Sequence, residues 1–320
     1  MAGRSMLQHG APTTFGLVCA GWLVALDDAR TGLTDVRRNR LAAQLGGAVG
    51  TLAPLDSKGA EVLSRFSDEL GLAEPVLPWH TDRSRVADLA ASLGAAAGVL
   101  AKIAKDVTLL ASTEVGEVAE GGPGGGSSAM PHKRNPVHSV VISADAHRVP
   151  GLVATIFAGM AQEHQRAAGA WQAEWGTLTE LLRLVGGAAA HGRELLAGLT
   201  IDPRRMRANL DLTGQAIMSG AVADRLAPTL GRTAAHELVT RAARRAAEER
   251  VTLRAALADE PGVRDTLSDT ALDEALDPGH SLGSAVTFVD RALAAHRALT
   301  ADLTDRPGEE NGEPWTTLST

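Results

Sequence analysis

The sequence predicts an all-α protein. Its 320 residues include four Phe, five Trp and no Tyr, while 44% of the residues are hydrophobic. Most core volume must therefore come from Leu, Val and Ala, which suit closely packed helices better than sheets. In residues 82–119 the apolar side chains recur three or four positions apart, as on one face of a long helix. These observations favour a bundle of long helices.

Long helices are expected in the first 200 residues, where the helical pattern is continuous and small residues beside the apolar stripe allow close packing. The expected helices are 13–38, 59–70, 82–119, 136–168 and 173–199. The first is followed by a glycine-rich stretch at 44–51, and Pro75 and Pro78 predict an extended connection. Pro136 suits a first helical turn, whereas Pro150 should kink or split its helix.

Shorter helices are expected after a break at Thr200–Pro203. They cover 204–212, 216–226, 233–249 and 282–303. We therefore expect a central long-helix bundle domain at 1–200, a small C-terminal helical domain at 201–305 and a flexible tail at 306–320. The tail is rich in Gly, Glu and Pro, which bury little apolar surface.

Composition also bounds the compartment and the partners. The single cysteine, Cys19, cannot form an internal disulfide and no signal-peptide pattern opens the chain, so we expect a cytoplasmic protein. The longest strongly apolar run, 15–26, is shorter than the roughly 20 residues of a spanning helix, so no membrane partner is expected. The net charge of −7 argues against nucleic acid, although local basic clusters can still bind a small anion.

A loop at 120–136 carries the residues best suited to chemistry. Its glycine run at 121–126 must interrupt the helical pattern, because consecutive glycines lose too much backbone entropy in a helix. Two hydroxyls, a lysine, an arginine and an asparagine then precede a helix start: Ser127, Ser128, Lys133, Arg134 and Asn135. Free N–H groups at a helix start favour an anion, so this set could stabilise a carboxylate that gains charge. A glycine linker with an ordinary N-cap explains the same residues equally well.

Other motifs for catalysis or metal binding are not matched. The lysine lies six residues after Ser127, which is not P-loop spacing, and the stretch 125–129 lacks the second glycine of a nucleophile elbow. His132, His138, His147 and His164 do not follow an HExxH pattern, so we expect no metal site.

The stretch 126–136, GSSAMPHKRNP, resembles the GSSxMPxKxNP signature of the fumarase/aspartase superfamily and matches it at every fixed position. Similar segments are Gly3-Arg4-Ser5 with Gln8, residues 12–16, residues 44–51, residues 162–166 and the sequence from Trp171 to Trp175. The resemblance covers most of residues 1–200. Within the superfamily the sequence is most similar to the bacterial 3-carboxy-cis,cis-muconate cycloisomerases.

The resemblance implies the fold, the reaction and the assembly. Superfamily members form long-helix bundles, act beside a carboxylate through an enolate-like dianion, and build each active site from three subunits of a homotetramer. A cycloisomerase would convert 3-carboxy-cis,cis-muconate to 4-carboxymuconolactone, in the protocatechuate branch of the β-ketoadipate pathway. One carboxylate of this small polycarboxylate substrate attacks the diene while a proton is added at carbon. The resemblance implies no cofactor.

The resemblance also implies roles for individual residues. Lys133 and Asn135 correspond to residues that stabilise the charge, and Ser127 corresponds to the serine that transfers the proton, although one sequence cannot separate it from Ser128. The expected substrate-binding residues are Arg4, Ser5, Gln8, His80, Ser128, Met130, Arg134 and Arg166. For His80 a structural role, and for Arg166 a surface ion pair, are the alternatives.

Two departures from the family pattern leave other functions open. Adenylosuccinate lyases carry a catalytic histidine directly after their Gly-Arg-Thr triplet, where this chain has Met6, which cannot exchange a proton. Family members also begin with an N-terminal domain that we expect to be missing here. The alternatives are an adenylosuccinate- or argininosuccinate-type lyase that releases fumarate, and a catalytically silent helical assembly module.

Overall fold

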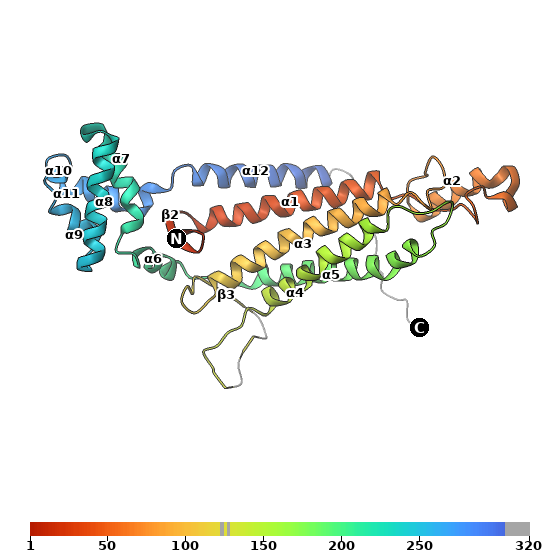
Figure 1. Ribbon diagram of the computed structural model, residues 1–320, viewed down its shortest axis with the longest axis horizontal. Helices are drawn as coiled ribbons and strands as arrows, with labels where there is room; N and C mark the ends of the chain where they lie inside the picture. The colour runs from red at the N-terminus through yellow and green to blue at the C-terminus, as the bar shows by residue number, and fades with distance from the viewer. Residues whose placement is uncertain (122–124, 127–128, 305–320) are drawn as a thin grey trace. The chain divides into compact units, whose positions relative to one another are not determined.

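The computed structural model describes residues 1–121, 125–126 and 129–304 (Figure 1). Helices make up most of this part of the chain, which confirms the all-α class. Its strands are short: β1 (Ala2–Ser5), β2 (Gln8–Pro12), β3 (Val118–Glu120) and β4 (Leu199–Ile201). The strands form two small sheets, in which β1 pairs antiparallel with β2, and β3 pairs with β4.

The chain divides into two compact units. One contains Met1–Leu23, Val115–Glu117 and the chain from Ile201 onward, and the other contains Val24–Glu114 and Val118–Thr200. The break after residue 200 lies where the sequence placed a domain boundary. The first 23 residues differ from that expectation, because their β1–β2 hairpin packs on helices of the C-terminal region.

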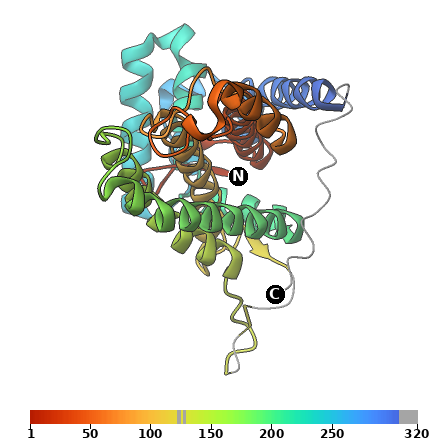
Figure 2. The same cartoon turned by 90° about the vertical axis from the view of Figure 1, so that its right-hand side faces the viewer.

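The second unit is built on three long helices that lie side by side, as both views show (Figure 2). They are α3 (Ser84–Leu110), α4 (Val137–Ala158) and α5 (Ala170–Gly198), and the shorter α2 is Gly59–Leu70. The apolar stripe expected in residues 82–119 has eight members, of which seven are buried and Leu89 is partly buried. The seven buried members are Val86, Leu93, Ala97, Leu100, Ile103, Val107 and Leu110. Ala90 and Ala104 are also fully buried on α3, so the small residues bring neighbouring helices close.

Two of the expected long helices are shorter than predicted. The segment expected to be helical to residue 119 ends as α3 at Leu110, and Gly116 then adopts a left-handed φ of 60° before β3. The helix expected to reach residue 168 ends as α4 at Ala158. Pro150, expected to kink or split its helix, does not split it, since α4 continues through this exposed residue, where the missing N–H removes a single helical hydrogen bond.

Helix α1 (Phe15–Asn39) begins in the first unit and ends in the second. The other helices of the first unit are α6 (Pro203–Asp211), α7 (Ser219–Leu230), α8 (Arg232–Glu249), α9 (Leu253–Ala258), α10 (Pro261–Arg264), α11 (Asp269–Leu276) and α12 (Ala285–Thr304). Short 3-10 turns lie at η1 (Ala53–Lys58), η2 (Ala216–Met218) and η3 (Pro278–Ser281). The sequence did not predict α9, α10 or α11. They pack with α7 and α8 around a core that includes Val222, Leu253 and Leu257.

The β1–β2 hairpin turns at two apolar residues. Met6 and Leu7 have φ values of 51° and 65°, and they are 98% and 75% exposed. A two-residue turn with both φ values positive normally contains Asn-Gly, Asp-Gly or Gly-Gly, because positive φ brings a Cβ too close to the following carbonyl oxygen and only Gly, and less readily Asn or Asp, tolerates it. The chain therefore places two bulky apolar side chains at a strained and exposed position.

Two helices, α3 and α4, are long and apolar enough to cross a membrane by length and composition alone. Both belong to the packed bundle of the second unit, and a core helix of a soluble protein meets the same criterion. The expectation that the protein has no membrane partner stays a prediction.

Candidate functional site

The loop residues expected to carry chemistry are only partly described. Ser127 and Ser128 lie outside the described residues. Lys133 and Arg134 are exposed, Met130 is 43% exposed, and the Lys133 N–H donates to the Met130 carbonyl at 2.9 Å. The Lys133 ammonium is therefore accessible to an anion.

Asn135 closes the base of this loop. Its backbone N–H and its side-chain Nδ2 both donate to the Gly125 carbonyl, at 2.8 and 2.9 Å. Gly125 has a φ of 71°, and a Cβ at this position would lie 2.4 Å from the Asn135 carbonyl oxygen. Because an asparagine amide has two donors, the second Nδ2 hydrogen stays available to a substrate.

The start of α4 is not the free anion site that the sequence suggested. The Glu120 carboxylate accepts the N–H of His138 and the N–H of Ser139, each at 2.9 Å, and also the Ser139 hydroxyl at 2.6 Å. Val137 and Val140 donate to backbone carbonyls, and Pro136 has no N–H. A carboxylate of the chain itself therefore occupies the helix start, where the helix dipole favours negative charge.

A histidine pair joins α4 to α5 just after this cap. The Nδ1 atoms of His138 and His191 lie 3.0 Å apart, a hydrogen-bond distance at which the N–H of one ring donates and the nitrogen of the other accepts. His191 and Glu120 contribute to this site although sequence reasoning did not single them out. A carboxylate close before a glycine run and a helix start was the only available signal for Glu120.

A second cluster surrounds Arg166, which follows α4. Arg166 donates to the backbone carbonyls of Gly47 and Ala48, and its Nη1 lies 3.3 Å from His80 Nδ1. Its guanidinium also lies over the Trp171 ring, 5.5 Å from the centroid. Burial, followed by the positive charges of Arg166 and Arg83, lowers the pKa of His80, which favours the neutral ring.

This cluster borders a small cavity of about 150 Å³. Its lining includes polar side chains and glycine backbone from three separate segments of the chain: Gln44, Gly46, Gly47, Gly50, His80, Thr81, His164 and Arg166. The structure therefore brings the predicted residues His80 and Arg166 together at one cavity. A small carboxylate fits the chemistry of such a lining, because guanidinium and backbone donors bind it.

A buried ion pair supports this cluster. Arg83 donates from Nε to Glu174 Oε2 at 2.9 Å and from Nη2 to Oε1, and both side chains are nearly inaccessible to solvent. Arg83 also donates to the His80 carbonyl at 2.9 Å and lies over the Trp79 ring. Glu174 therefore neutralises an arginine that holds the backbone of His80 in place.

The two clusters of the second unit lie at opposite ends of α4 (Figure 1). Lys133 and Asn135 precede this 22-residue helix, and Arg166 follows it. At a rise of 1.5 Å per residue the helix is about 33 Å long. One small substrate cannot touch Lys133 and Arg166 of the same chain.

The predicted residues of the first unit form a separate group. The Arg4 guanidinium is bound by the fully buried Glu117 carboxylate, at 2.7 and 3.0 Å, and Asn209 donates to the same carboxylate at 2.8 Å. Arg4 therefore has a structural partner, whereas Ser5 and Gln8 are exposed beside the hairpin turn.

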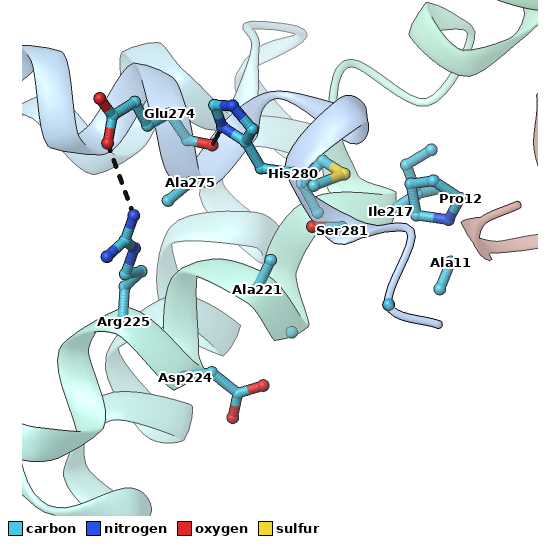
Figure 3. A pocket seen from close by; sticks show the side chains of 13 residues that line it. Ala11, Pro12, Ile217, Ala221, Asp224, Arg225, Glu274, Ala275, His280 and Ser281 are labelled. Carbon is cyan, nitrogen blue, oxygen red and sulfur yellow. Dashed lines mark hydrogen bonds and ion pairs between the residues drawn. The ribbon is translucent and has the colours of Figure 1, made fainter. Parts of the chain in front are cut away.

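A cavity of about 620 Å³ in the first unit contains none of the predicted site residues (Figure 3). Its wall includes Asp224, His280 and Ser281, and an ion pair of 3.5 Å joins Arg225 to Glu274 at its edge. Within residues 1–121, 125–126 and 129–304, no group of three or more His, Cys, Asp or Glu side chains is arranged to hold a metal ion.

Comparison with known proteins identifies the family. A family model described as "Lyase" matches residues 1–151, and one described as "Adenylosuccinate lyase C-terminus" matches residues 215–292. A crystal structure of the 3-carboxy-cis,cis-muconate lactonizing enzyme from Pseudomonas putida matches with a TM-score of 0.88 and 45% identity, over 94% of this chain and 67% of that chain. The chain belongs to the fumarase/aspartase superfamily.

Curated relatives of the chain include a cycloisomerase and a lyase. The chain is 51% identical over 301 residues to a 3-carboxy-cis,cis-muconate cycloisomerase from Pseudomonas aeruginosa. The matched region covers 93% of this chain and 66% of that protein. It is 46% identical over 303 residues to a nitrosuccinate lyase from Streptomyces davaonensis, over 92% of this chain and 64% of that protein. The chain thus spans about two thirds of the length of these relatives. The expected similarity to the cycloisomerases is confirmed.

Proposed function

We propose that this chain is a cycloisomerase that converts 3-carboxy-cis,cis-muconate to 4-carboxymuconolactone. The observation that carries the proposal is the 51% identity over 301 residues to a cycloisomerase, in a chain that keeps the whole GSSAMPHKRNP loop. The reaction moves no atom out of the substrate. A carboxylate oxygen forms a bond to one alkene carbon, and a proton is added to the neighbouring carbon.

The proposed role of the loop follows from its accessible charge. Adding the proton requires that negative charge pass through an enolate-like form of the adjacent carboxylate, and an ammonium and an amide donor stabilise that charge. Lys133 is exposed and Asn135 has a spare donor, which suits both groups to this role. Ser127 is proposed as the group that transfers the proton. Bringing the two ends of the substrate together supplies much of the remaining rate enhancement.

We also propose that the protein acts as a cytoplasmic homotetramer with active sites shared between subunits. The length of α4 supports this assembly, because Lys133 and Arg166 can bind one substrate only if different copies supply them. Helices α4 and α5 expose large apolar residues that provide surface for such contacts: Val140, Phe157, Trp175 and Leu182. Light scattering of the purified protein should give four times the chain mass of 33.1 kDa.

The test of the reaction is the loss of diene absorbance with 3-carboxymuconate. Lys133→Ala should lower kcat by about 10²–10³-fold, the loss typical of removing one charge-stabilising donor. Lys105→Ala removes another exposed lysine of the same unit and should leave kcat unchanged. Turnover by the Lys133→Ala variant at the rate of the Lys105→Ala variant would contradict the proposed role.

A second candidate is a lyase that eliminates a group from a substituted succinate, supported by the 46% identity to a nitrosuccinate lyase. On nitrosuccinate this reaction would break the C–N bond and release nitrite and fumarate, and adenylosuccinate or argininosuccinate would likewise release fumarate. Appearance of fumarate without diene turnover would favour this candidate. Failure with every one of these substrates would favour a silent assembly module.

A further inference from the structure

The first turn of α4 is capped from another element of the chain. A helix start leaves N–H groups without helical partners, and the residue before α4, Pro136, provides no side-chain cap. Glu120 supplies the missing acceptors, because its two carboxylate oxygens take the N–H groups of His138 and Ser139 at 2.9 Å. The fully buried Ser139 adds its hydroxyl to the same carboxylate at 2.6 Å.

Glu120 is itself held in place by its neighbours along the chain. It ends β3, where the Thr200 hydroxyl donates to the Ala119 carbonyl at 2.9 Å and the Gly121 N–H donates to the Gly198 carbonyl at 2.8 Å. These bonds tie the end of β3 to the end of α5. The carboxylate is therefore presented to α4 from a fixed backbone.

The loop that carries Lys133 begins after Glu120 and ends at the start of α4. The Glu120 carboxylate therefore links the two ends of this loop. A second link across the loop is made by Asn135, whose backbone N–H and side-chain Nδ2 both donate to the Gly125 carbonyl. Five residues separate Lys133 from the capped Ser139 along the chain: Arg134, Asn135, Pro136, Val137 and His138. A change in the direction of the first turn of α4 would therefore move the ammonium group.

We propose that Glu120 is a positioning residue that places Lys133 and Asn135 for their action on a substrate carboxylate. The inference rests on the proposed function. If Glu120 has this role, the substrate anion is bound by side chains such as Lys133 and not by the start of α4, because the Glu120 carboxylate already accepts the N–H groups there. Glu120 acts through the loop and does not itself touch the substrate.

The test compares Glu120→Ala and Glu120→Gln with Glu194→Gln, an exposed glutamate on α5 of the same unit. Hydrogen exchange measured by mass spectrometry should be about tenfold faster in Glu120→Ala for peptides containing His138 and Ser139, the change expected when a helix cap is lost. Glu120→Gln should be intermediate, since its amide oxygen replaces one acceptor and its NH₂ group cannot accept. Unchanged exchange at these amides would overturn the inference.

The kcat per folded protein distinguishes a positioning role from a purely structural role, which would leave it unchanged. Per folded protein, kcat should fall about 100-fold in Glu120→Ala, as for a small displacement of a catalytic group, while KM changes less. The activity order should be wild type, then Glu120→Gln, then Glu120→Ala. Equal kcat in Glu120→Ala and Glu194→Gln would overturn the inference and leave the proposed function intact.

Two further results separate the remaining cases. If Glu120→Ala does not fold, Ser139→Ala removes only the hydroxyl donor and should lower kcat in the same direction by a smaller factor; an unchanged kcat would count against the inference. Absence of any turnover by the wild-type protein would instead overturn the proposed function. The exchange measurement would then still decide whether Glu120 fixes the loop.

Discussion

Removal of the Glu174 carboxylate should strongly destabilise the protein. Glu174 and Arg83 form a two-bond ion pair whose side chains are only 10% and 6% exposed. In Glu174→Gln the guanidinium keeps the His80 carbonyl and one amide oxygen as acceptors, but its charge stays buried without a counter-charge. Breaking such a pair costs about 3–5 kcal/mol. At 1.4 kcal/mol per factor of ten, the unfolding equilibrium constant should rise by about two to three and a half orders of magnitude.

Urea unfolding followed by tryptophan fluorescence measures this change, because Trp79, Trp171 and Trp175 lie in or beside the cluster. The matched control is Glu61→Gln on α2, which breaks an ion pair whose side chains are 60% and 77% exposed and should change the free energy of unfolding by less than about 1 kcal/mol. The double variant Arg83→Met/Glu174→Leu should recover most of the lost stability, since it buries no charge at this site. Equal free energies of unfolding in the Glu174→Gln and Glu61→Gln variants would refute the reasoning.

Three other variants test separate parts of the second unit. Arg166→Gln should raise the pKa of His80 in an NMR titration, because it removes a nearby positive charge; in the wild type, the stability from the neutral ring is present above about pH 6.5 and is lost as pH falls through the lowered pKa. Leu181→Ala, at a fully buried site on α5, should lower the free energy of unfolding by about 2–5 kcal/mol, as measured in urea. Gly125→Ala should speed hydrogen exchange at Asn135, because the new Cβ would overlap the Asn135 carbonyl oxygen; normal protection would contradict the loop geometry.

The long helices could be predicted because their apolar residues repeat over many turns. The apolar stripe runs along nearly all of α3, a helix of 27 residues, so its period is clear even though the end of the helix was misplaced. Helices α9, α10 and α11 contain six, four and eight residues, which is too short for a helical period to appear. Thr252 and Ser268 cap the starts of α9 and α11, and these local signals were missed; the positions of the helices depend on packing against α7 and α8.

The site residues were predictable as residue types but not as partners. The chemistry of the loop pointed to Lys133 and Asn135, because a loop rich in donors suits an anion, whereas only the family resemblance pointed to Arg166. It could not show that Glu120 caps α4, since familiar cap patterns place the cap residue within three positions of the N–H it accepts, and this contact spans 18 residues. Nor could it show that Arg4 is bound by Glu117, which is 113 residues away.

The hairpin turn at Met6 and Leu7 has a consequence for how this protein can be redesigned. A procedure that ranks sequences by folding energy alone would replace both residues by Asn-Gly, which relieves the positive φ values and removes exposed hydrocarbon. The hairpin is therefore a place where a short substitution should raise the stability of the chain without disturbing its buried core.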